Sequence, residues 1–162
     1  MFVLRFTQDL MKDMKVSPTE HADTSELFSW HSHIYRLNNR KHIIFINDLS
    51  RLCVIIDGVR TAQIKQLKQK FLSTLEQYLL YEDIHQGLVN AYVSSKSEII
   101  ISKTNSRSVL ATMKEITMHE TDAHLDLKDN MERMKWLNRL IYKPIDYKEP
   151  IHVFKDAIQN QF

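Results

Sequence analysis

Two kinds of hydrophobic spacing divide the chain and predict where strands and helices lie. Between residues 27 and 57, apolar and polar positions follow a strand pattern around the Asn38-Asn39 pair, which favours a β-hairpin. We expect residues 31–56 to form an antiparallel meander. Apolar runs at residues 2–6 and 97–102 predict two more strands, and the second run is expected to join the same sheet.

The other apolar positions recur at helical steps of three and four. The clearest case is a long helix whose inward side carries Ile64, Leu67, Phe71, Leu75 and Tyr78. Shorter helices are predicted at residues 7–16 and 85–92, from Ser106 onward, at residues 129–142 and after Pro150. The 129–142 pattern points Met134, Leu137 and Ile141 inward.

Together these patterns predict one α+β domain spanning residues 1–162, with a largely antiparallel sheet and about five helices. Strands cluster before most helices, which argues for α+β over alternating βαβ units. A length of 162 residues suits one domain with a real core.

Composition excludes several classes of protein. The 43% hydrophobic and 26% charged residues with a net charge of +2 are ordinary for a globular protein and lack a strong basic signal. Only Gly58 and Gly87 are glycines, which excludes the glycine-rich phosphate-binding loops. Cys53 stands alone inside an apolar run, so we expect a buried thiol, no disulfide and no multi-cysteine metal site.

Hydropathy indicates a cytoplasmic location with no membrane partner. The N-terminal apolar run is too short for a signal peptide, and no apolar stretch approaches the length of a membrane span. The oligomeric state is left open by these patterns.

The strongest candidate site is the polar junction between the 97–102 strand and the following helix. Its ligand-binding candidates are Thr104, Asn105, Ser106, Arg107 and Ser108. The first turn of the helix has an arginine and no acid, so its free N–H groups, the hydroxyls and the guanidinium would suit a phosphate or carboxylate. The alternative interpretation is structural: Thr104, Asn105 or Ser106 caps the helix, and Arg107 pairs with an acid elsewhere.

Two other groups of side chains are weaker candidates. His31 and His33 lie two apart on one predicted strand, so both face the same side of the sheet and could serve as acid–base groups. A catalytic zinc needs a third protein ligand, so we predict no metal and no cofactor. Arg40 and Lys41 at the hairpin could assist binding of a nucleic-acid backbone, although charged hairpin ends are common.

Several segments resemble a bacterial family known only as a domain of unknown function, DUF6933. They are "SWH" at 29–31, "RKHIIFIND" at 40–48, "KTNSRSVLATM" at 103–113, and "NRLIYKP" with "YKEP" near the end. The resemblance implies no reaction. It supports a binding role for the 104–110 motif beyond capping.

Three functional hypotheses therefore stay open. The first is a module that binds a phosphate-bearing small molecule or nucleic acid at the junction. The second is a hydrolase or phosphoryl-handling enzyme that uses His31 and His33. The third is a component that acts through protein interaction or regulation, with a purely structural junction.

Overall fold

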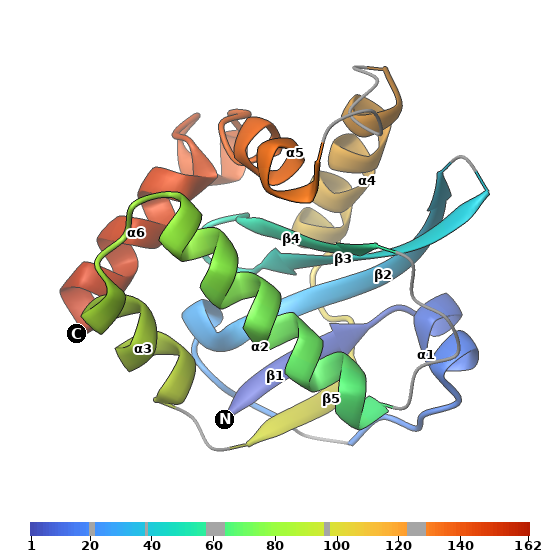
Figure 1. Cartoon of the computed structure of the whole chain (residues 1–162). Helices are drawn as coiled ribbons and strands as arrows, with labels where there is room; N and C mark the ends of the chain where they lie inside the picture. The colour runs from blue at the N-terminus through green and yellow to red at the C-terminus, as the bar shows by residue number, and fades with distance from the viewer. Residues whose placement is uncertain (20–21, 38, 58–63, 96–97, 123–128) are drawn as a thin grey trace.

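A five-stranded mixed sheet forms the centre of the fold, in the order β4-β3-β2-β1-β5 (Figure 1). The computed structural model describes residues 1–19, 22–37, 39–57, 64–95, 98–122 and 129–162. The strands are β1 (Phe2–Phe6), β2 (Ser29–Leu37), β3 (Arg40–Asn47), β4 (Cys53–Asp57) and β5 (Ile99–Lys103).

The antiparallel meander expected at residues 31–56 is confirmed. β2 pairs antiparallel with β3 from Trp30↔Asn47 to Leu37↔Arg40, and β3 pairs antiparallel with β4. Asn39 has a φ of 62°, a left-handed conformation that asparagine tolerates and that suits a tight hairpin.

Strand β1 makes the sheet mixed, because it lies parallel to both β2 and β5. The second apolar run therefore joins the same sheet, as expected, and the α+β class is confirmed. Two of the four strand pairings are nevertheless parallel. Alternation of side chains reports which face a residue occupies and carries no information on strand direction.

The helices cover both faces and one edge of this sheet (Figure 1). They are α1 (Gln8–Met14), α2 (Ile64–Tyr81), α3 (Gln86–Ser94), α4 (Arg107–Asp122), α5 (Asn130–Leu137) and α6 (Pro150–Gln161). Helices α2 and α6 pack aromatic rings against Trp30 of β2, while α4 contacts the opposite face of β2 through Tyr35. Helix α5 packs along the edge strand β4.

The helix predicted at residues 129–142 is shorter than expected. Helix α5 ends at Leu137, and Ile141 is 58% exposed, so its inward assignment was wrong. The physical reason is Asn138, whose side chain binds the backbone of Cys53 in β4. After Asn138 the chain turns, and Tyr142 is buried instead of Ile141. None of the helices seen in the described ranges is both long and apolar enough to cross a membrane.

Candidate functional site

The polar junction between β5 and α4 is partly a helix cap. The hydroxyl of Ser106 accepts the backbone N–H of Val109 at 3.2 Å, as an N-cap side chain does. Among the hydrogen bonds of the described residues, none uses the backbone N–H of Arg107 or Ser108 as donor. The first turn of α4 holds no acid. The capping interpretation is therefore correct for Ser106, and two backbone donors stay available beside it.

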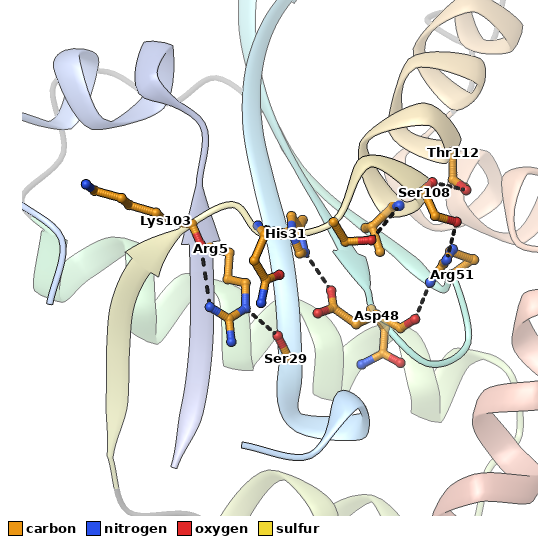
Figure 2. A network of polar contacts seen from close by, with 12 residues as sticks. Arg5, Ser29, His31, Asp48, Arg51, Lys103, Ser108 and Thr112 are labelled. Atoms are coloured by element: carbon orange, nitrogen blue, oxygen red, sulfur yellow. Dashed lines mark hydrogen bonds and ion pairs between the residues drawn. The ribbon is translucent and has the colours of Figure 1, made fainter. Parts of the chain in front are cut away.

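A buried histidine of β2 holds the junction in place (Figure 2). The Nε2 atom of His31 accepts the backbone N–H of Asn105 at 3.1 Å, and its Nδ1 atom lies 2.7 Å from Oδ1 of Asp48. Because a backbone N–H can only donate, Nε2 must be unprotonated, and Nδ1 carries the proton that it donates to Asp48. Through these two contacts the fully buried His31 connects the junction to the turn after β3.

That turn contributes a buried arginine to the same region. Arg51 has a φ of 64° and is 7% exposed. Its guanidinium donates to the carbonyl oxygen of Asp48 and, at 2.8 Å, to the hydroxyl of Ser108 (Figure 2). Its Nε atom is buried without a hydrogen-bond partner. Burial lowers the pKa of Arg51, whereas the carboxylates of Asp48 and Glu26 act in the opposite direction.

A second buried arginine comes from the central strand β1. Arg5 is 6% exposed, and its Nε donates to the hydroxyl of Ser29 at 3.0 Å. Its other nitrogens donate to the carbonyl oxygens of Ala22 at 3.2 Å and Lys103 at 3.5 Å. All three partners are neutral oxygens. Within the described parts of the chain, no carboxylate forms an ion pair with Arg5 or with Arg51.

Both arginines line one cavity of about 600 Å³, here called the junction cavity. This volume lies within the usual range of small-molecule sites, about 300–1,000 Å³. Polar side chains dominate the lining, and they include Arg5, Ser29, Asp48, Arg51, Asn105 and Ser106. The cavity therefore collects groups from β1, the start of β2, the turn after β3 and the junction before α4.

The predicted ligand-binding residues of the junction fall in different places. Asn105 and Ser106 line the cavity, and Ser108 contacts it through Arg51. Thr104 lines a neighbouring hollow with Lys103. Arg107 is exposed and outside the cavity lining, and its side chain forms no hydrogen bond or ion pair with another described residue. A role for Thr104 or Arg107 in binding stays a prediction.

The basic hairpin lies away from the cavity. The two are joined by β2, in which six residue steps separate His31 from Leu37, or about 20 Å at about 3.3 Å per residue. Arg40 is exposed, and Lys41 forms an ion pair with Asp13 at 2.7 Å. Neither side chain lines the junction cavity.

The two histidines share a face of β2 and have separate partners. His33 lies 2.7 Å from the hydroxyl of Thr7 through its Nδ1, and burial lowers its pKa although Asp9 opposes this. It lines a smaller hollow of about 270 Å³ with Leu110 and Met113. In the residues that the structure places, no three His, Cys, Asp or Glu side chains gather as a metal ion would require.

Sequence reasoning missed Arg5 and Arg51 as residues of the site. Arg5 interrupts the apolar run of residues 2–6, and a charged residue inside a strand predicted to be buried could have indicated a functional position. Arg51 follows a short polar turn and carries no comparable signal. Its position depends on the positive φ and on contacts with residues distant in sequence.

Comparison with known proteins identifies the family. A family model described as a domain of unknown function, DUF6933, matches residues 3–153, a range that contains every residue lining the junction cavity. A comparison with curated proteins found no match. Since the family model covers more than half of the sequence, the chain belongs to the DUF6933 family of proteins.

Proposed function

We propose that this chain is a binding module that holds the anionic group of a small molecule, a phosphate or a carboxylate, in the junction cavity. The observation that supports this most directly is the pair Arg5 and Arg51. Both are more than nine-tenths buried, line the same cavity and form no ion pair with a carboxylate among the described residues. A buried charge is costly unless an opposite charge or hydrogen bonds compensate it. A bound anion would supply the missing charge.

The start of α4 adds neutral donors to this positive region. Asn105 and Ser106 line the cavity, and the backbone N–H groups of Arg107 and Ser108 lie at the positive end of the helix dipole. Helix starts of this kind favour phosphate and carboxylate groups. The helix start supports the proposal as an addition to the two arginines.

The geometry favours a small molecule over the other hypotheses. A nucleic-acid backbone would need the basic hairpin, but Arg40 and Lys41 lie outside the cavity. An enzyme using His31 and His33 together is less favoured, because both ring nitrogens of His31 already have partners and His33 lines a separate hollow. An interaction component with a structural junction remains the outcome if no anion binds.

Titration calorimetry with inorganic phosphate and sulfate tests the proposal. We expect wild-type protein to bind an anion and Arg51→Lys to bind it more weakly by about 1.5–3 kcal/mol, the contribution of a hydrogen bond to a charged group. Lysine keeps the charge and loses the planar fork of donors. Arg107→Ala is the control, because Arg107 lies at the start of the same helix but does not line the cavity. Thermal melts without anions show whether each variant is folded.

Two results would contradict the proposal that the junction cavity is the anion-binding site. If neither anion binds the wild type, the junction is structural and the proposed function fails. If Arg107→Ala weakens binding as much as Arg51→Lys does, the anion sits at the exposed start of α4, as the sequence predicts.

A further inference from the structure

The junction cavity carries negative as well as positive side chains. Asp23, Glu26 and Asp48 line it together with the two arginines. Asp48 is bonded to His31, whereas Asp23 and Glu26 are exposed and form no ion pair with other described residues. Opposite charges therefore face one cavity without pairing across it.

The two signs come from different segments of the chain, and Glu26 is close enough to Arg51 to act on its pKa without an ion pair between them. The guanidiniums are carried by β1 and by the turn after β3, and each is held by neutral oxygens. The carboxylates of Asp23 and Glu26 lie on the segment just before β2. One of the contacts of Arg5 is the carbonyl oxygen of Ala22, so Arg5 also anchors the residue before Asp23.

From this arrangement, and resting on the proposed function, we infer that the ligand is a small zwitterion. Its phosphate or carboxylate faces Arg5 and Arg51, and an ammonium group faces Asp23 and Glu26. A simple anion would meet the two guanidiniums but also the unpaired carboxylates, and like charges facing each other are unfavourable. A zwitterion complements charges of both signs, and the volume of about 600 Å³ accommodates a molecule of that size.

Three probes with matched structures test the charge pattern: phosphoethanolamine, ethyl phosphate and inorganic phosphate. We expect wild-type protein to bind phosphoethanolamine about tenfold more tightly than ethyl phosphate, which lacks the amine, at neutral pH and fixed ionic strength. The double variant Asp23→Asn, Glu26→Gln should lose this preference and bind ethyl phosphate at least as tightly as the wild type. The variant Glu115→Gln, Asp156→Asn removes two exposed charges outside the cavity and should keep the preference.

The outcomes separate this inference from the proposed function. Equal binding of phosphoethanolamine and ethyl phosphate overturns the zwitterion and leaves the anion site intact. A preference that survives in the Asp23, Glu26 double variant also overturns it, because the amine is then recognised elsewhere. If none of the three probes binds, the anion site and the zwitterion fail together.

Discussion

At the residue scale, Asn138 covers part of the outer edge of the sheet with one side chain. Its Oδ1 accepts the backbone N–H of Cys53 at 2.7 Å, and its Nδ2 donates to the carbonyl of Cys53 at 3.0 Å. Asn130, eight residues earlier, donates to the carbonyl of Ile55 at 2.8 Å. β4 is an edge strand, and unpaired edges invite association with other chains. The amide of Asn138 thus makes the contacts that a neighbouring strand would make.

Asn138→Ala should destabilise the fold by about 1–3 kcal/mol, because it leaves a buried N–H without an acceptor. Asn138 is fully buried, so water has no access to replace the lost partner. Urea unfolding measures the difference. Asn160→Ala, at an exposed position in α6, is the control and should stay within about 0.5 kcal/mol of the wild type. Equal stability of the two variants would contradict a structural role for Asn138.

At the element scale, a buried charged cluster joins α4, α5 and the meander. Arg133 of α5 is ion-paired with Asp57 at the end of β4, and its Nη1 lies 3.4 Å from Glu120 of α4. The hydroxyl of Tyr35 donates to Glu120, and Nδ1 of His42 lies 2.5 Å from Asp57. Burial raises the pKa of Glu120, although Tyr35 and Arg133 oppose this. One guanidinium thus stands between two carboxylates of different elements.

Arg133→Leu should destabilise the fold by about 3–5 kcal/mol, since it removes the guanidinium that neutralises the carboxylates of both Glu120 and Asp57 and leaves them only Tyr35 and His42 as partners. The side chain of Glu120 is completely buried and cannot turn to water. Chemical unfolding measures the loss. Lys148→Leu removes an exposed cation and should change the stability little. A loss below about 1 kcal/mol in Arg133→Leu would show that the cluster contributes no net stability.

A second pair of charges, Glu82 and Arg139, links the turn after α2 to the segment after α5 and makes the stability depend on pH. Burial alone would raise the pKa of Glu82, but hydrogen bonds from Arg139 and Tyr78 outweigh it and hold the pKa below its ordinary value of 4.5. Arg139 contacts both carboxylate oxygens of Glu82 at 2.8 Å. A lowered pKa in the folded state means that this stability is present above the unfolded pKa and is lost as the pH falls through the folded pKa.

Glu82→Gln should therefore show a smaller loss of stability between neutral pH and strongly acidic pH than the wild type shows. Unfolding free energies measured across the range below pH 4.5 test this. Glu76→Gln, a change of the same kind on α2, serves as the control and should keep the acid dependence of the wild type. If the stability of the wild type and of Glu82→Gln fell equally with pH, the pair of Glu82 and Arg139 would not be a source of the acid dependence.

At the scale of the whole molecule, the two ends of the sequence share one core. Phe154 of α6 packs its ring 5.1 Å from Tyr92 of α3 and 6.0 Å from Trp30 of β2, measured between centroids. Trp30 donates its indole N–H to the hydroxyl of Tyr92, which donates to the carbonyl of Leu27. Helix α6 therefore covers the same face of the sheet as α2 and α3 (Figure 1).

Phe154→Ala should destabilise the fold by about 3–5 kcal/mol, because it leaves a cavity between α6 and the sheet. Phe154 is fully buried, whereas Phe162 near the end of the same helix is 48% exposed. Phe162→Ala is thus the matched control and should cost much less. Thermal and urea unfolding compare the two variants. Similar losses in both would mean that α6 does not contribute to the shared core.

The sequence by itself determined the elements and the class of the fold, because hydrophobic spacing directly reports which side of an element is buried. The meander, the later strand in the same sheet, the long helix with Phe71 inward and the polar start of α4 all follow from local pattern. Only the tertiary structure decided the parallel pairing of β1, the early end of α5 at Leu137 and the cavity itself. Each of these depends on contacts between residues far apart in the chain. Arg5, Arg51 and Asn105 line one cavity only after the chain has folded, and the hydrophobic periodicity of a single segment cannot predict this.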